Sequence, residues 1–174
     1  MVVSAPILLR DAGLRLTADS RVLIIGTIGA GKSHFICNLV EEFDSVKTHS
    51  IDDCRRENSA WTRAGEKKAR ETFLRACAEK NGIFECTGAG PLYKRIEQIA
   101  FSNPFDCVLR VHTPTQVCME RVSSRRDWPP YPITTMPDSN LIDAISDELD
   151  SHGFDRQSSE WNGQILLHVS GVIE

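Results

Sequence analysis

The sequence lacks the features that mark several large protein classes. Its six cysteines form no CxxC pair and have no histidine at zinc-ligand spacing, which argues against a structural metal and indicates reduced thiols. No run approaches the ~20 apolar residues needed to cross a bilayer, and no basic segment leads into a long apolar run at the N-terminus. We therefore expect a soluble, unsecreted, cytoplasmic protein that does not bind membranes.

An excess of positive charge is also missing. The formal net charge of the 174 residues is -4, so the whole molecule is not of the basic type that coats nucleic acid. No internal repeat or low-complexity tract divides the chain. Because 41% of the residues are hydrophobic, the chain can bury a single core, and we expect one domain over residues 1–174.

Short apolar runs alternate with longer segments of helical period. The runs are typical of buried strands, expected at residues 22–25, 46–51, 83–86, 107–111 and 165–169. The longer segments predict helices at residues 32–43, 61–80, 92–101, 115–123 and 140–151, with Pro114 and Asp138 at helix starts. This order predicts an α/β fold, with a mainly parallel five-stranded sheet and helices on both faces.

Two segments fall outside this alternation. Residues 1–20 form an N-terminal extension, in which residues 7–17 alternate around Gly13 and could form an added edge strand or hairpin. From Ser123 onward the sequence becomes irregular and includes Pro129, Pro130 and Pro132, which cannot continue a helix. We expect an irregular, arginine-bearing loop there.

The strongest signal is the octapeptide GTIGAGKS at residues 26–33, which fits GxxxxGK[ST] and lies between an expected strand and an expected helix. In such a P-loop the glycines let backbone N–H groups face phosphate oxygens, and the helix adds the positive end of its dipole. Lys32 is expected to reach the β- and γ-phosphates of ATP, and Ser33 to bind Mg²⁺. The predicted ATP-binding residues are Gly26, Thr27, Gly29, Ala30, Gly31, Lys32, Ser33 and the adjoining His34.

Two carboxylates and two guanidinium groups follow the second expected strand, where ligands bind in open α/β sheets. They belong to Asp52, Asp53, Arg55 and Arg56. A phosphoryl acceptor needs a base for its hydroxyl and donors for any phosphate that it carries, so Asp52 is the candidate base and the other three are candidate acceptor contacts. The alternative is a pair of surface carboxylates that caps the next segment.

An acidic residue, Glu85, stands in the third expected strand, where many P-loop proteins carry an aspartate that supports the metal. We predict a metal role for Glu85 through water, with the alternative that it ties down Arg55 or the P-loop. Thr87 and Gly88 begin a flexible turn that is expected to border the acceptor.

The P-loop, the Asp52-Asp53-x-Arg55 pattern and Arg121-x-x-x-Arg125 before a proline-containing loop resemble the polynucleotide 5'-kinases of the P-loop kinase superfamily. The similarity covers residues 22–150. It implies a P-loop kinase fold with a small lid at residues 121–137. It also implies that Asp52 is the general base, Arg55 contacts the acceptor phosphate, and Arg125 neutralises charge on the transferring phosphoryl group, with Arg121 as an ATP-binding helper and Arg126 as a second.

The acceptor is less well specified than ATP. Residues 55–80 hold eight Lys/Arg against four Asp/Glu, which favours a phosphate-bearing acceptor, although a solvated helix face gives the same pattern. A nucleic acid with a 5'-hydroxyl or hydroxymethylpyrimidine, a free nucleotide and a small metabolite all fit. Trp61 and Trp128 could stack on a base or pack in the protein.

Two classes of P-loop protein transfer no phosphate to an acceptor. A regulatory GTPase would need a guanine-reading [NT]KxD tetrapeptide, which the sequence does not contain. A non-catalytic P-loop ATPase or switch would keep Lys32 and Ser33 but has no use for Asp52 together with a lid arginine. A kinase that acts on a nucleic acid or nucleotide is therefore the favoured function.

Overall fold

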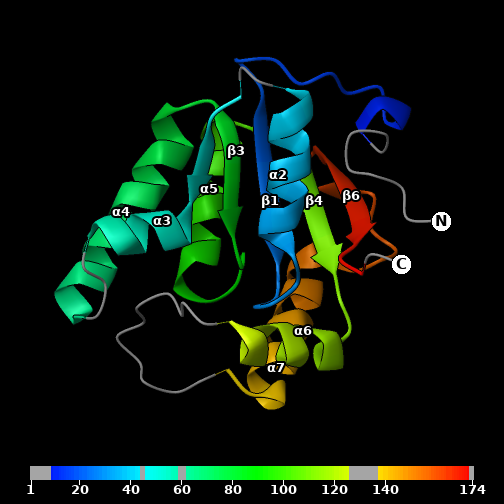
Figure 1. The fold of residues 1–174 in the computed structure, drawn as a ribbon. Coiled ribbons are helices and arrows are strands. Elements are labelled where there is room, and N and C mark those ends of the chain that lie inside the picture. The colour runs from blue at the N-terminus through cyan, green and yellow to red at the C-terminus, as the bar shows by residue number, and fades with distance from the viewer. Residues whose placement is uncertain (1–8, 44–45, 59–61, 126–136, 173–174) are drawn as a thin grey trace.

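The computed structural model describes residues 9–43, 46–58, 62–125 and 137–172 (Figure 1). In this part of the chain a six-stranded sheet has the order β2-β3-β1-β4-β6-β5. Every neighbouring pair is parallel except β5 and β6. The strands are β1 Arg21–Gly26, β2 Thr48–Ser50, β3 Gly82–Cys86, β4 Cys107–His112, β5 Glu160–Trp161 and β6 Gln164–Ser170. The five predicted parallel strands are thus confirmed.

Helices cover both faces of this sheet. They are α2 Lys32–Glu42, α3 Ile51–Glu57, α4 Arg63–Glu79, α5 Tyr93–Ser102, α6 Thr115–Ser124 and α7 Ser139–Leu149. A 3-10 turn, η1 Gly90–Leu92, leads into α5, and a wider turn, η2 Asp150–Phe154, extends α7. The predicted helix starts are confirmed, because Pro114 precedes α6 and the Asp138 side chain accepts a hydrogen bond from the Leu141 N–H.

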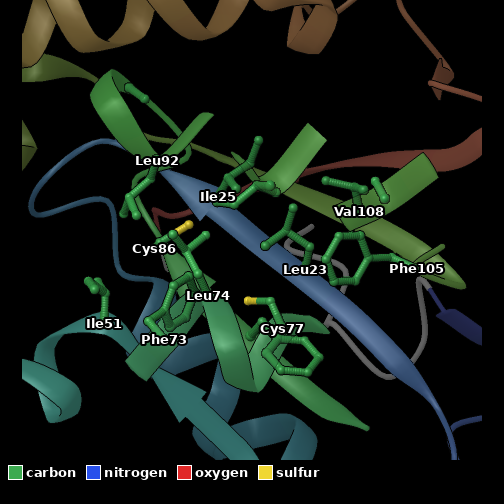
Figure 2. Close-up of a cluster of buried hydrophobic side chains, with 14 of the residues drawn as sticks. Leu23, Ile25, Ile51, Phe73, Leu74, Cys77, Cys86, Leu92, Phe105 and Val108 are labelled. Atoms are coloured by element: carbon green, nitrogen blue, oxygen red, sulfur yellow. The ribbon is translucent and has the colours of Figure 1, made fainter. Parts of the chain in front are cut away.

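The central strand β1 is buried along its whole length and divides its side chains between two cores. Val22 and Ile24 pack with the residues of α2 on one face. Leu23 and Ile25 pack with α4, α5 and α7 on the other, and Figure 2 shows them in one cluster with Phe73 and Val108. This two-residue period with apolar side chains on both faces explains why the strand reads as a continuous hydrophobic run.

Four details differ from the sequence-based expectations. Ile51, expected to end the second strand, instead begins the helix α3, which the Ser50 hydroxyl caps and which was not expected. Residues 9–11 are helical and residues 12–17 contain no strand, so the expected N-terminal edge strand is wrong for residues 9–17. The short strand β5 was not expected, although Asn162 and Gly163, both with positive φ, form the two-residue turn that joins it to β6. The fourth is the extension of α7 by η2.

All six cysteines are free thiols, and five of them are buried. Burial raises the pKa of Cys86 and Cys107 to about 12, which keeps these thiols protonated at neutral pH. Within the described ranges no helix combines the length and the apolar character needed to cross a membrane.

Candidate active site

A cavity of about 790 Å³ lies at the carboxyl ends of the parallel strands. Four segments supply most of its lining: the P-loop, the β2–α3 junction, the turn after β3, and α7. Arg70 of α4 and Arg125 at the end of α6 complete it. Figure 1 shows why these segments meet, since β1 delivers the P-loop to the same end of the sheet at which α6 and α7 lie.

The P-loop turns sharply between β1 and α2, and two of its glycines are required there. Gly29 has φ 78° and Gly31, the N-cap of α2, has φ 92°, a region that favours glycine. A Cβ at Gly29 would also lie 2.6 Å from the Cys118 carbonyl oxygen. The glycines of the motif therefore set the curl that turns backbone N–H groups toward a phosphate.

Lys32 is buried at the base of this loop, with 8% of the residue exposed. Its Nζ donates to the carbonyl oxygens of Gly26 and Thr27, each at 3.0 Å. The same Nζ lies 3.6 Å from Oε1 of Glu85. The ammonium group is thus held between the loop backbone and a buried carboxylate, beside the cavity that Lys32 lines.

Glu85 links three elements at this point. It lies in β3 beside Ile24 of β1, and its Oε2 accepts a hydrogen bond of 2.9 Å from the Ser50 hydroxyl. Of the two alternatives given for Glu85 besides a metal role, the contact with the P-loop is present. The ion pair with Lys32 makes that contact.

A magnesium ion would find suitable oxygen donors here. The hydroxyl of Ser33 and the carboxylate of Glu85 both line the cavity. Mg²⁺ in phosphoryl-transfer sites takes one or two protein oxygens and completes its shell with water and phosphate. The described residues contain no group of three His, Cys, Asp or Glu side chains that could hold an ion by themselves. The donor set fits an ion that is bound together with ATP, and the metal role of Glu85 stays a prediction.

The two adjacent aspartates have different surroundings. The Asp52 side chain is 26% exposed and accepts a 2.9 Å hydrogen bond at Oδ1 from Nη1 of Arg55. The Asp53 side chain is 60% exposed and pairs with Arg56, itself 58% exposed. Both lie in the first turn of α3, where the helix dipole favours negative charge. Asp52 is therefore the more sheltered and more firmly held carboxylate at the cavity.

Glu66 and Arg70 of α4 were not among the predicted site residues, and Glu66 holds the group together. It is buried, and its carboxylate accepts two hydrogen bonds of 2.9 Å from Arg55 and one of 2.8 Å from Nε of Arg70. Burial alone would raise the pKa of Glu66, but the hydrogen bonds and charges of Arg55 and Arg70 outweigh it and hold the pKa below its ordinary value. We call Asp52, Arg55, Glu66 and Arg70 the acceptor wall.

A signal for Glu66 was present in the sequence. Glu66, Ala69, Phe73 and Cys77 are spaced as one face of a helix, and all four are buried. An acidic residue on a core-facing stripe is rarely buried without a partner. Arg70 follows Glu66 by four residues on the same helix, so that this contact could be expected from the sequence. Arg55 precedes Glu66 by eleven residues, and that contact could be found only from the fold.

Solved structures of similar fold include several kinases. A gluconokinase from Sinorhizobium meliloti is 15% identical, with 91% of this chain and 86% of that chain covered and a TM-score of 0.54. A deoxyadenosine kinase from M. mycoides with bound dATP is 13% identical, with coverage of 88% and 92% and a TM-score of 0.52. A chain of the Pnkp1/Rnl/Hen1 RNA repair complex is 15% identical, with coverage of 79% and 46% and a TM-score of 0.58.

The chain has the fold of the P-loop kinases. No protein-family model and no curated protein sequence matches it. At these low identities the likeness extends to the fold, and the activity has to be argued from the residues of the cavity.

The arginines expected in the lid of this P-loop kinase fold occupy two positions. Arg121 donates from Nη1 to the carbonyl oxygens of Gly29 and Ala30, both at 3.3 Å, and from Nη2 to that of Gly171 at 2.7 Å. It thereby fastens the P-loop to the end of β6. Arg125 follows α6, is exposed and lines the cavity.

The remaining predicted site residues are divided between the cavity and its surroundings. Thr87 lines the cavity and Gly88 is not among its lining residues, whereas His34 lies exposed beside Asn38. A Cβ at Gly88 would lie 2.7 Å from Cγ2 of Ile25. Predictions for Trp61, Arg126, Trp128 and residues 126–136 of the lid fall outside the described residues.

Proposed function

We propose that the chain is an ATP-dependent kinase that transfers the γ-phosphate to a hydroxyl group of a nucleic acid or nucleotide. One observation carries the proposal: Lys32 and Ser33 of the P-loop line the same cavity as Asp52, a carboxylate held in place by Arg55. A phosphate cradle and a positioned carboxylate in one cavity are what phosphoryl transfer to a hydroxyl requires.

In this proposal each side chain has a defined task. Lys32 binds the β- and γ-phosphates, and Mg²⁺ bound through Ser33 supplies further neutralisation of phosphate charge. Asp52 accepts the proton of the attacking hydroxyl, and its hydrogen bond from Arg55 fixes the orientation of the carboxylate. Arg125 meets the charge that develops on the transferring group.

The acceptor class is supported by the charge of the cavity. Arg55, Arg56 and Arg70 all line it on the side of Asp52, and guanidinium groups suit a phosphate that flanks the acceptor hydroxyl. The structures of similar fold include a deoxyadenosine kinase and an RNA repair complex. The free thiols and the requirement for ATP favour action in the cytoplasm.

A small-metabolite acceptor is the second candidate, and one observation favours it. Leu92, Leu141 and Ile145 form an apolar part of the cavity lining. Such a surface could accept the carbon skeleton of a compact substrate as well as the face of a base.

The test is a single transfer screen with γ-labelled ATP. Its acceptors are 5'-hydroxyl DNA and RNA oligonucleotides, DNA with hydroxymethylpyrimidines, nucleosides and nucleotides, and a panel of sugars and hydroxy acids. Label on a nucleic acid or nucleotide, lost in Asp52→Asn, is the expected result. Label confined to a metabolite would replace the acceptor class, and ATP hydrolysis without any labelled acceptor would contradict the kinase.

A further inference from the structure

Three arginines line the cavity near Asp52, and they differ in what holds them. Arg55 directs Nε and Nη2 to Glu66 and Nη1 to Asp52, so all three of its nitrogens have carboxylate partners. Arg56 forms an exposed pair with Asp53. Arg70 is intermediate: its Nε is bound to Glu66, its side chain is 38% exposed, and within the described residues its Nη groups have no hydrogen-bond partner.

Arg55 and Arg70 share the carboxylate of Glu66, and these differences give them different tasks. Arg55 is committed to Glu66 and to the candidate base, which makes it a residue that positions Asp52. Arg70 is fixed at Nε by a buried carboxylate, lines the cavity, and keeps two N–H₂ groups that have no hydrogen-bond partner among the described residues. A guanidinium group held at its inner nitrogen is pre-organised to bind a phosphate through the outer pair.

We propose that Arg70 binds the phosphate that flanks the acceptor hydroxyl, and that Glu66 is the positioning residue that sets Arg70 for this phosphate and Arg55 for Asp52. The inference rests on the proposed kinase function. It also gives a reason for a buried acid on the core-facing side of α4, because one carboxylate there couples acceptor binding to the orientation of the base.

The binding test uses the smallest probe pair that differs by one phosphate. Thymidine 3'-phosphate and thymidine are titrated calorimetrically into the full chain with Mg²⁺ and a non-hydrolysable ATP analogue. The wild type is expected to bind the phosphorylated probe more tightly. Arg70→Gln should weaken that binding about tenfold, leave thymidine and nucleotide binding unchanged, and reduce the salt dependence by about one charge.

Lys67→Gln is the matched control for charge. Lys67 lies on the same helix, its side chain is 79% exposed, it pairs with Glu71, and it is not among the residues that line the cavity. Its loss removes the same charge from α4 without removing a cavity donor. Equal effects of Lys67→Gln and Arg70→Gln would mean that only the general field of the helix matters, and would overturn the role of Arg70.

Glu66 is tested by the way its loss divides between kcat and KM in the transfer assay. Glu66→Gln keeps the shape of the side chain but loosens both arginines, so the KM for the acceptor should rise and kcat should fall. Arg70→Gln should raise KM with little change in kcat. A Glu66→Gln protein that is less stable to heat but keeps both constants would show a structural role only, and would overturn the positioning role.

The failures of this inference and of the proposed function are distinguishable. If the wild type binds thymidine and thymidine 3'-phosphate equally, the inference is overturned, whereas the transfer screen can still identify a kinase. If Arg70→Gln removes a preference for the phosphorylated probe but no nucleic acid or nucleotide is labelled, the phosphate contact is supported and the proposed acceptor is wrong.

Discussion

The P-loop and the acceptor wall lie at one cavity but are built from different materials. The P-loop is a run of eight residues whose backbone is predicted to bind phosphate, and its glycines allow the required turns. The acceptor wall is made of side chains from α3 and α4, joined by hydrogen bonds through Glu66. A backbone site demands particular residues at fixed spacing, whereas a side-chain network can be assembled from many sequences.

This comparison predicts how each region tolerates substitution. In the P-loop, Lys32 is the side-chain cation, and its loss leaves the backbone cradle unassisted. In the acceptor wall, Arg55 and Glu66 each pair with two charged side chains, and Asp52 and Arg70 are each joined to one of these two. One substitution therefore disturbs several contacts. A substitution in the P-loop should therefore have a severe effect that is confined to the use of ATP. A substitution in the acceptor wall should change both the affinity for the acceptor and the turnover rate.

The largest effect is expected for Lys32→Ala. Phosphoryl transfer should fall at least ~10³-fold and ATP affinity should weaken strongly, because the cation at the β- and γ-phosphates is lost. Calorimetric titration with ATP measures the affinity directly. Lys94→Ala, an exposed lysine of α5 away from the cavity, is the control. Unchanged ATP affinity in folded Lys32→Ala would refute the P-loop assignment.

Lys32→Ala also leaves Glu85 as a buried carboxylate without its ion-pair partner. Breaking a buried pair in this way costs about 3 kcal/mol of stability. The double variant Lys32→Ala/Glu85→Gln should recover part of that loss in a denaturant melt and recover no activity. This separates the structural contribution of the pair from its contribution to ATP binding.

The next effect compares the two neighbouring aspartates of α3. Asp52→Asn should lower kcat ~10²-fold or more while ATP affinity stays near that of the wild type, because the base is lost and the cradle is not. Asp53→Asn should stay close to wild type, since its exposed pair with Arg56 contributes little. Single-turnover transfer with both variants decides the matter, and an inactive Asp53→Asn beside an active Asp52→Asn would exchange their roles.

The features that could be predicted from the sequence follow the same division between local and long-range contacts. The five parallel strands, the P-loop and the start of α7 at Asp138 were predictable, because each depends on local pattern or on residues adjacent in the chain. The helix α3 was missed because an apolar strand and a short amphipathic helix share the residues around Ile51. The contact between Arg55 and Glu66 was not predictable, since it depends on how α3 packs against α4.

A smaller effect should distinguish the two described arginines of the predicted lid. Arg125 is exposed at the cavity and holds no part of the P-loop, so Arg125→Ala should lower kcat about tenfold with a smaller rise in the KM for ATP. Arg121→Ala removes the hydrogen bonds to Gly29, Ala30 and Gly171. It should mainly raise the KM for ATP and lower the melting temperature, and equal small losses in both variants would contradict a lid role for Arg125.

The smallest expected effect concerns the sheet rather than the P-loop or the acceptor wall. His112 of β4 and His168 of β6 share a hydrogen bond of 2.8 Å, and neither lines the cavity. His168 Nε2 lies 2.7 Å from the Ser158 carbonyl oxygen, which can only accept. His168 therefore donates from Nε2, and its Nδ1 accepts from His112 Nε2–H.

Burial, together with the charges of Arg110 and Arg156 and the neighbouring His168, lowers the pKa of His112 from 6.5 to about 3. The unfolded chain consequently binds this proton before the folded chain does. The stability that rests on neutral His112 is complete above pH 6.5 and is lost as the pH falls from there toward 3.

Allowing for the partial exposure of the ring, this loss should amount to about 1 kcal/mol between pH 7.5 and pH 5. Urea unfolding at the two pH values measures it, with His112→Asn as the test because its amide side chain does not titrate between these pH values. The pH dependence of stability should be smaller in His112→Asn than in the wild type. ATP affinity at pH 7.5 should be the same in both proteins, because His112 does not line the cavity. Identical pH dependence in wild type and His112→Asn would mean that His112 is protonated as readily in the folded sheet as in the unfolded chain.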